Sequence, residues 1–267
     1  MYAINSWGEL PPAFLSYIYP IEQDLELQYA SLMPIDTVDF SLPEATIYKP
    51  KKYSVSPPFW TIFSHEITEK IFKKGGRILD IGGGLRIVEK GGFKIDAIRQ
   101  QRLSQHLSSP HVEFIVSDYT DQYGPDRVED IHQLSFAENS LDGIFCMAVL
   151  EHVYDPKKAA EEITRVLKKG GEAFLYVPFM YRYHANTTED YKDYFRYSKD
   201  GIAYLFRNCT QITICPVRGL FESLLRFTPL HNVPFLATLL RSLDWMTKRM
   251  RAISERQSSG YFIHLIK

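Results

Sequence analysis

The sequence predicts an α/β protein built on a doubly wound sheet, from three observations. Short apolar strands alternate with helical patterns from residue 57 onward. Strand segments such as LDGIFCMAV do not alternate cleanly with polar residues, which is typical of parallel strands buried on both faces. The segment RILDIGGGL, residues 77–85, leads from a strand directly into three glycines, which allow a tight turn at the end of the strand.

The elements follow in a regular order. Residues 1–56 are rich in proline, tyrosine and acids without clear periodicity, so we expect an irregular N-terminal arm there. A helix is expected after Pro57, with Pro58 in its first turn and Gly75 at its end. Further strands are expected at RILDI, VEFIVSD, LDGIFCMAV, EAFLYVPF, QITICPVRG and GYFIHLIK, and further helices at DPKKAAEEITRVLKKGG and around residues 202–206. The chain therefore divides into the arm and a domain over residues 57–267.

A helical insert is predicted at about residues 218–258, between the last two strands. Its segment FLATLLRSLDWMTKRMRAIS has an apolar side and a basic polar side. A core or cap helix is the favoured interpretation. Contact of the 231–256 helix with a membrane surface or a partner helix is the less favoured alternative.

Composition excludes several classes of protein. A formal net charge of −1 gives no global electrostatic argument for nucleic acid. Three cysteines without a CxxC motif and without clustered histidines argue against a disulfide framework or a structural zinc, so we expect no metal and a reducing, cytoplasmic setting. The N-terminus has no signal-peptide pattern, and the apolar runs are far shorter than the roughly 20 residues that span a bilayer.

The glycine turn is the first candidate for a ligand site. In the dinucleotide fingerprint, three spaced glycines place a pyrophosphate at a helix N-terminus, but here Ile87 stands at the third position. Asp80 precedes Gly82 by two residues, and an acid there repels a pyrophosphate but suits a cationic ligand. S-adenosylmethionine carries a sulfonium and an ammonium group and no phosphate. By itself, the turn fits a plain strand-to-helix connection equally well.

Further motifs sharpen this interpretation. RILDIGGG, SDY, VEDIHQLSFAENSLDGIFCMAVLEHV, ITRVLKKGGEAFLYVPF and DYFRYS follow one another in the chain. In that order they resemble the class I S-adenosylmethionine-dependent methyltransferases, in the branch with LPF-, SFD-, VLEHV- and RVLKPGG-like motifs. The resemblance covers roughly residues 57–210. It implies a Rossmann-like sheet of about seven strands, mostly parallel with an antiparallel last strand, and helices on both faces.

The resemblance also implies S-adenosylmethionine as the cofactor and a set of residues that hold it. The implied residues are Asp80, Gly82, Gly83, Gly84, Asp118, Asp130, Ile131, Met147 and Ala148. Asp80 and the glycine backbone would line the methionine half. Asp118 would accept hydrogen bonds from both ribose hydroxyls, for which a carboxylate is well suited. Asp118 lies farther along the chain than the ribose acid of the family usually does, so Asp96 is a competitor by spacing.

The other implied residues would lie at the adenine and at the sulfonium. The carboxylate of Asp130 would take the exocyclic amine, and Ile131 would pack on the ring. Met147 and Ala148, at the end of a strand, would lie beside the sulfonium. Each has a simpler alternative, since Asp118 and Asp130 also fit solvated loop acids and Met147 also fits a core residue.

Candidates for the chemistry of transfer follow two strands. They are Glu151 and His152 in LEHV, and His184, Asp193 and Arg196 in the loop after EAFLYVPF. Members of the family often carry a histidine there, followed by a D-x-x-R-Y/F motif. His184 or His152 would act as a base, and Arg196 would bind an anionic or glycan-like acceptor. Alternatively, Asp193 and Arg196 form an ion pair that orders the loop, and His152 caps a helix.

The preferred hypothesis is methyl transfer to a small molecule or glycan by in-line displacement, which requires alignment of acceptor and sulfonium and exclusion of water. A relative that binds the cofactor without catalysis is the first alternative. An NAD-dependent oxidoreductase is a weaker one, because of Ile87 and Asp80. The acceptor atom and the oligomeric state do not follow from the sequence.

Overall fold

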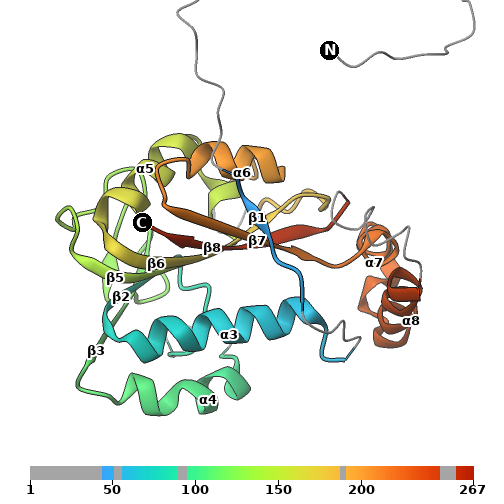
Figure 1. Cartoon of the computed structure of the whole chain (residues 1–267), viewed down its shortest axis with the longest axis horizontal. Coiled ribbons are helices and arrows are strands. Elements are labelled where there is room, and N and C mark those ends of the chain that lie inside the picture. The colour runs from blue at the N-terminus through green and yellow to red at the C-terminus, as the bar shows by residue number, and fades with distance from the viewer. Residues whose placement is uncertain (1–43, 51–55, 90–94, 187–190, 247–256) are drawn as a thin grey trace, which may run out of the picture. The chain divides into compact units, whose positions relative to one another are not determined.

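The computed structural model describes residues 44–50, 56–89, 95–186, 191–246 and 257–267. Within them the strands form one sheet in the order β1-β7-β8-β6-β5-β2-β3-β4 (Figure 1). The strands are β1 (Thr46–Ile47), β2 (Gly76–Ile81), β3 (Val112–Asp118), β4 (Arg127–Val128), β5 (Leu141–Met147), β6 (Leu167–Pro178), β7 (Gln211–Val217) and β8 (Gly260–Ile266). β8 is antiparallel to both neighbours and the other pairs are parallel. The predicted mostly parallel sheet with an antiparallel last strand is confirmed, with β1 added at one edge.

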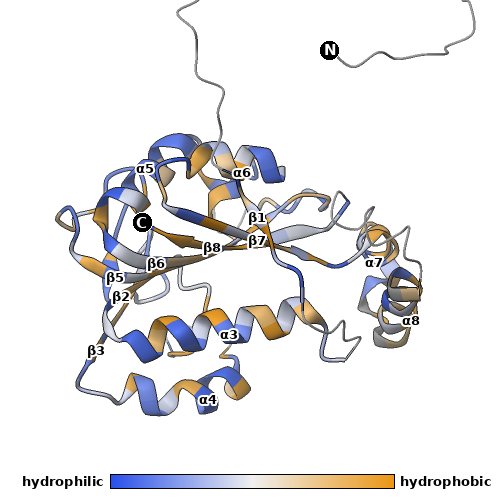
Figure 2. Cartoon of the chain, viewed as in Figure 1, coloured by the Kyte–Doolittle hydropathy of each residue, from blue (hydrophilic) through white to orange (hydrophobic). Residues whose placement is uncertain are grey.

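Both faces of the sheet are covered by helices. α3 (Phe59–Lys74) and α4 (Ala97–Leu107) lie on one face, and α5 (Pro156–Val166) and α6 (Lys199–Leu205) lie on the other (Figure 1). Neighbouring strand residues therefore enter different cores: Ile144 packs with α5, whereas Phe145 packs with α3. This is why the central strands carry apolar residues without alternation. Figure 2 shows the hydrophobic colouring concentrated on the central strands, with hydrophilic residues on α4 and α5.

α3 begins and ends where the sequence predicts. Pro58 stands at its N-cap, and Gly75 follows its last residue with φ +70°, a conformation that favours glycine. One side of the helix is buried against the sheet through Trp60, Phe63, Ile67, Ile71 and Phe72. Lys73 and Lys74 occupy its last turn, where cations are favourable.

α5 is shorter than the sequence predicts. Asp155 caps it by accepting a hydrogen bond from the Lys158 amide at 3.0 Å. The helix ends at Val166 rather than at the following glycines, because Leu167 has extended backbone and pairs with Leu141 in the sheet. Burial of Leu167 and the strand pairing outweigh the helical pattern of the lysines that follow.

The predicted insert contains α7 (Leu220–Leu225), the short 3-10 helix η2 (Pro229–Asn232) and α8 (Pro234–Met246). The Asp244 carboxylate accepts hydrogen bonds from the amides of Phe221 and Glu222, which joins α8 to α7. Arg241 pairs with Glu222 at 2.7 Å and stacks over Trp60 of α3. These contacts attach the insert to the domain. The part of the predicted helix beyond Met246 lies outside the described residues.

The apolar side of this insert is largely exposed. Its exposed hydrophobic side chains are Leu224, Phe227, Leu230, Val233, Phe235, Leu239, Leu243 and Met246. α8 is therefore not a fully covered core helix in the part that the structure describes. Among the described helices, none combines the length and the apolar character needed to cross a bilayer.

Only part of the predicted N-terminal arm is described. Residues 44–50 include β1, which pairs in parallel with β7 through Thr46 and Thr213. Residues 1–43 and 51–55 lie outside the described residues. The division of the chain at residues 56 and 57 stays a prediction.

A buried charge cluster ties α3 to the sheet. Glu172 of β6 contacts His264 of β8 at 2.7 Å and Lys70 of α3 at 2.8 Å. Burial alone raises the pKa of this carboxyl, but the hydrogen bonds from His264 and Lys70 outweigh it and hold the pKa at about 2. Glu172 is therefore ionised at neutral pH and holds three elements together.

We expect Ile163→Ala to lower the free energy of unfolding by about 2–4 kcal/mol, because Ile163 of α5 is fully buried and its truncation leaves a cavity. Ile98→Ala is the matched control: Ile98 of α4 is 81% exposed, so we expect a change within about 0.5 kcal/mol. Urea unfolding of both variants measures the difference. Equal effects would contradict the placement of α5 on the sheet.

We expect Glu172→Gln to cost on the order of 2 kcal/mol of stability at pH 7, with the cost shrinking in acid. The pKa is lowered on folding, so the carboxylate stabilises the folded state above its unfolded pKa of 4.5. That contribution is lost as the pH falls towards about 2. Urea midpoints of wild type and variant at pH 7, 5 and 3 measure it. A difference that is constant over this range would contradict the assigned pKa.

Candidate active site

The glycine turn lies where several parallel strands end. It follows β2, which pairs with β3 on one side and β5 on the other. Gly82 and Gly83 have φ of +75° and +57°, which residues with a side chain rarely adopt. A Cβ on Gly82 would lie 2.6 Å from a methyl carbon of Val149, so the turn packs tightly against the segment after β5. The Gly82 amide donates to the Ser117 carbonyl at 2.7 Å, which fixes the start of the turn.

Asp80 is a buried acid beneath this turn. Its side chain accepts a hydrogen bond from the Leu85 amide at 3.1 Å, while Oδ1 is buried without a hydrogen-bond partner in the part of the chain that the structure describes. Burial raises the pKa of the Asp80 carboxyl to about 7, against the lowering effects of the Leu85 amide and Arg99. A cation next to Asp80 Oδ1 would favour the ionised carboxylate.

A hollow of about 390 Å³ opens beside the turn. It is lined by Gly84, Leu85, Arg86, Ile95, Asp96, Arg99, Met147 and Ala148. Thus the end of the glycine turn, the end of β5 and the start of α4 meet around one space. Asp96 caps α4 and pairs with Arg99, whose guanidinium also donates to the Leu85 carbonyl at 3.1 Å.

The backbone after the glycines does not form the dinucleotide arrangement. Residues 82–89 are turns and irregular chain, and the next helix in the described residues, α4, begins at Ala97. A pyrophosphate site of the dinucleotide type needs a helix N-terminus directly after the turn. The chain following β2 therefore adds a loop, with residues 90–94 outside the described part.

Met147 and Ala148 form the opposite wall of the hollow. A Cβ on Gly84 would lie 2.6 Å from the Cβ of Met147, so these two segments are in close contact. Ala148 has φ +59°, which is uncommon for a residue other than glycine and indicates local strain. Its amide donates to the Tyr176 carbonyl of β6 at 3.0 Å, which holds this conformation.

The predicted ribose and adenine residues lie one and two strands farther out. Asp118 ends β3, next to β2, and its charge acts on Asp80. Its Oδ1 accepts a hydrogen bond from the Thr120 amide at 3.2 Å. Asp118 is not among the residues that line the hollow, whereas its competitor Asp96 is. The two acids occupy different places, Asp118 at a strand end and Asp96 at a helix N-cap.

Asp130 and Ile131 follow the short strand β4. Ile131 is buried in the core on the α5 side. One oxygen of Asp130 accepts both the backbone amide and the ring Nδ1 of His132, at 2.9 and 2.7 Å. Burial raises the pKa of Asp130, but the two hydrogen bonds from His132, with the charges of His132 and Lys158, together outweigh it and lower the pKa. Asp130 is thus a largely exposed carboxylate held in one orientation.

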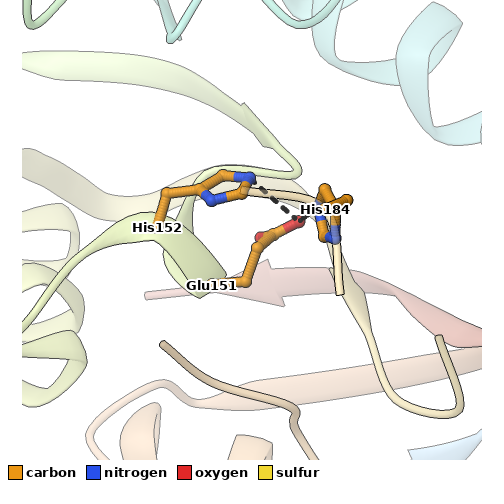
Figure 3. A group of neighbouring side chains, drawn as sticks. All are labelled: Glu151, His152 and His184. Atoms are coloured by element: carbon orange, nitrogen blue, oxygen red, sulfur yellow. Dashed lines mark ion pairs between the residues drawn. The ribbon is translucent and has the colours of Figure 1, made fainter. Parts of the chain in front are cut away.

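A second cluster lies at the ends of β5 and β6. Glu151 and His152 belong to the 3-10 helix η1 (Leu150–His152) after β5, and His184 lies in the loop after β6. Glu151 Oε1 is 3.9 Å from His152 Nε2 and 3.7 Å from His184 Nε2 (Figure 3). Both rings approach the same carboxylate oxygen. The Glu151 carboxylate, followed by Asp193, raises the pKa of His184 against the effect of burial.

Arg196 orders the loop that carries His184. Its Nε donates to the Tyr181 carbonyl, and Nη1 donates to Asp193 and to the Phe195 carbonyl. Nη2 donates to Asp193 and to the Arg182 carbonyl. These contacts use all five guanidinium N–H donors. The geometry therefore corresponds to an ion pair that orders the loop.

Asp193 holds His184 from the opposite side. Its Oδ2 accepts the His184 amide at 2.8 Å and lies 3.1 Å from the ring Nδ1. Burial raises the pKa of Asp193, but Arg196 and the His184 amide outweigh it and hold the pKa at about 2. The ionised Asp193 thus joins the arginine to the histidine.

Sequence reasoning found most of these positions but not how they combine. The turn, Met147 and Ala148 share one hollow, and His152, His184, Asp193 and Arg196 share one cluster. The arginines at 86 and 99 in the hollow were missed, because they lie in the segment that departs from the family spacing. Glu151 was named as a candidate, but its burial and its contact with both histidines depend on the path of a distant loop.

Comparisons with known proteins agree with this fold. A family model described as a methyltransferase domain matches residues 96–175, which begin after the glycine turn. Ubiquinone biosynthesis O-methyltransferases of Xanthomonas campestris pv. campestris (strain B100) and Xylella fastidiosa (strain M23) are 29% and 28% identical over 121 and 113 residues. Each match covers 41% of this chain, and 46% and 44% of those proteins. The chain thus spans less than half the length of the curated relatives it matches.

Solved structures of methyltransferases also align with the chain. A SAM-dependent methyltransferase from Archaeoglobus fulgidus aligns over 80% of this chain and 95% of its own, with 14% identity and a TM-score of 0.48. The Haemonchus contortus phosphoethanolamine N-methyltransferase 2, in complex with S-adenosyl-L-methionine, covers 72% of this chain and 49% of its own, with 16% identity and a TM-score of 0.41. The family model thus matches a methyltransferase domain over residues 96–175, and the order of the strands agrees with the resemblance of the motifs to the class I S-adenosylmethionine-dependent methyltransferases.

Proposed function

We propose that this chain transfers the methyl group of S-adenosylmethionine to an oxygen of a small-molecule or glycan acceptor. The observation that carries the proposal is the hollow between the glycine turn and the end of β5, above the buried Asp80. The curated relatives are named O-methyltransferases, which favours an oxygen acceptor.

The hollow fits the methionine half of the cofactor. Asp80 Oδ1 is a buried acceptor without a partner in the described residues, and a ligand ammonium supplies both the proton donor and the positive charge. The guanidinium groups of Arg86 and Arg99 line the same hollow and suit the ligand carboxylate. Gly82 and Gly84 let the backbone approach without a side chain between.

The ribose and the adenine extend along the strand ends. Asp118, at the end of β3, has an acceptor-only carboxylate beside the turn and is proposed for the ribose hydroxyls. Asp96 lines the hollow, but its carboxylate already accepts the Arg99 amide and pairs with the Arg99 guanidinium. Asp118 is therefore the favoured ribose acid. Asp130 is proposed for the adenine amine because it is exposed and oriented by His132. Ile131 would pack against the ring.

The bound cofactor supplies a methyl carbon activated by positive sulfur. Met147 and Ala148 wall the hollow at the proposed sulfonium position. His152 and His184 are the proposed groups at the acceptor oxygen, because their Nε2 atoms converge beside the end of β5. Asp193 and Arg196 are proposed as positioning residues, since every donor of the guanidinium is already engaged by the protein.

The cytoplasmic setting stays a prediction from the cysteines, all three of which are free and buried. No nucleic-acid partner is proposed. The exposed apolar side chains of the insert support a contact surface there, and contact with a lipid surface or a partner helix is the alternative use of this helix.

We expect Asp118→Ala to weaken binding of S-adenosylmethionine and S-adenosylhomocysteine by about 10- to 100-fold, because two hydrogen bonds to a charged acceptor are lost. Gly84→Ala should weaken binding as well, because the added Cβ would lie 2.6 Å from Met147 Cβ and displace the wall. Isothermal titration calorimetry measures both changes.

Two matched controls accompany these variants. Asp121→Ala removes an exposed acid three residues beyond Asp118, and Gly201→Ala places a Cβ in ordinary contact, 3.4 Å from Ser198 Oγ. Both should bind the cofactor like the wild type. The proposal would be contradicted if the wild type bound neither ligand, or if Asp118→Ala bound them as tightly as the wild type. Tight binding without transfer to any acceptor in a broad panel would point to the non-catalytic alternative.

A further inference from the structure

The cluster at the ends of β5 and β6 brings together three groups that commonly bind metal ions. Glu151, His152 and His184 each offer one ligand atom, and these atoms all lie within 4.8 Å of one another (Figure 3). Two come from η1 and one from the loop after β6. The parallel pairing of β5 with β6, with Met147 opposite Tyr176, brings both segments to the same edge of the sheet.

Glu151 is the least satisfied member of this cluster. The residue is 1% exposed, and its Oε2 is buried without a hydrogen-bond partner in the described residues. Its Oε1 lies 3.9 and 3.7 Å from the two histidine Nε2 atoms, beyond hydrogen-bond distance. A buried carboxylate in this condition is costly unless a cation joins it.

The outer nitrogens of both rings are held by acceptors. His152 Nδ1 contacts the Lys192 carbonyl, and a carbonyl only accepts, so this nitrogen carries the proton. The same holds for His184 Nδ1, which lies 3.1 Å from Asp193 Oδ2 and 3.2 Å from the Arg182 carbonyl. Arg196 Nη2 is farther from this nitrogen, at 3.5 Å, and already donates to two oxygens.

The inner nitrogens therefore present lone pairs. In neutral rings with the proton on Nδ1, both Nε2 atoms face Glu151 Oε1 as acceptors. Three electron-pair donors then point into one space, an arrangement that requires a positive charge between them. Either a second proton on one ring or a metal ion provides it.

The chemistry of the donors matches a divalent transition metal. Two neutral imidazoles and one carboxylate are a ligand set of catalytic zinc sites, which keep an open fourth position. The outer contacts of both rings, to Asp193 and to backbone carbonyls, are those that fix metal-binding histidines. The donor separations of 3.7 and 3.9 Å leave room for an ion after a small contraction.

We propose that Glu151, His152 and His184 bind a divalent transition metal ion, with Zn²⁺ as the representative ion, and that its open position takes the acceptor oxygen. The second part rests on the proposed methyltransferase function. Bound to the ion, an acceptor hydroxyl releases its proton to water at a lower pH. Its oxygen then forms the bond to the methyl carbon, and the carbon–sulfur bond breaks with its electron pair going to sulfur. His152 and His184 act in this scheme as ligands and not as bases.

The test uses the full-length chain after dialysis against a chelator. We expect titration with Zn²⁺ to show one tight site, and Co²⁺ to show the visible absorption of a four-coordinate ion with nitrogen and oxygen ligands. Glu151→Gln, His152→Gln and His184→Gln should each weaken Zn²⁺ binding by at least about 100-fold, since each removes one ligand. His111→Gln is the control, an exposed histidine directly before β3 at the amino end of that strand, and should bind like the wild type.

The outcomes separate a metal ion from a proton. Absence of tight Zn²⁺ binding by the wild type, or equal binding by the three variants, would overturn the proposal and leave a protonated histidine pair. Thermal unfolding is recorded for every variant. If the buried Glu151→Gln does not fold, Zn²⁺ binding by His152→Gln tests the site instead. The His152 side chain is partly exposed, so its replacement disturbs the fold less.

The same samples separate this site from the proposed function. Calorimetry with S-adenosylhomocysteine should give wild-type affinity in His152→Gln and His184→Gln, because the metal ligands lie outside the hollow. Zn²⁺ binding without any cofactor binding would sink the proposed function and keep the metal site. Cofactor binding without Zn²⁺ binding would contradict the metal site and leave the proposed function standing.

Discussion

The parallel pairing of β5 between β2 and β6 is the constraint on which both sites depend. In register, Ile81 lies opposite Cys146, and Met147 lies opposite Tyr176. Three strands therefore end at the same level, and the chain leaves each of them on the same edge. The glycine turn follows β2, η1 follows β5 and the histidine loop follows β6. Slipping this register by one residue would reverse the faces of the strand and separate these segments.

Two buried acids lie near the carboxyl ends of the central strands. Asp80 and Glu151 are each 1% exposed, and each has one oxygen without a partner in the described residues. Burial raises the pKa of the Cys146 thiol, and the charges of Glu151 and Asp80 raise it further. Orphaned buried acceptors are uncommon in folded proteins, and they gather where a ligand completes them. Asp80 at the end of β2 and Glu151 after β5 are two such acids, and they agree with the two proposed ligands, the cofactor ammonium and the metal ion.

The fold follows from the sequence because its signals are local. Apolar spacing and flanking glycines locate α3, and unbroken apolar runs locate β2, β3 and β5. The end of α5 was misplaced because a tertiary contact, the pairing of Leu167 with Leu141, overrides helical propensity. The hydrogen-bond network of Arg196 and the approach of His184 to Glu151 depend on a loop path that residue types do not encode. The sequence argued against a metal because it has no CxxC motif and no clustered histidines, whereas His184 comes close to Glu151 and His152 only through the fold.

The two sites lie on opposite sides of the segment that follows β5, which bears on how transfer is arranged. Gly82 packs on Val149 from the β2 side, and His184 approaches Glu151 from the β6 side. In-line displacement needs the donor sulfur and the acceptor oxygen on opposite sides of the transferred carbon. A cofactor over the glycine turn and an acceptor at the histidine cluster would be supported from these two sides. Strain at Ala148, on the wall of the hollow, is then explained as the result of turning the chain sharply between them.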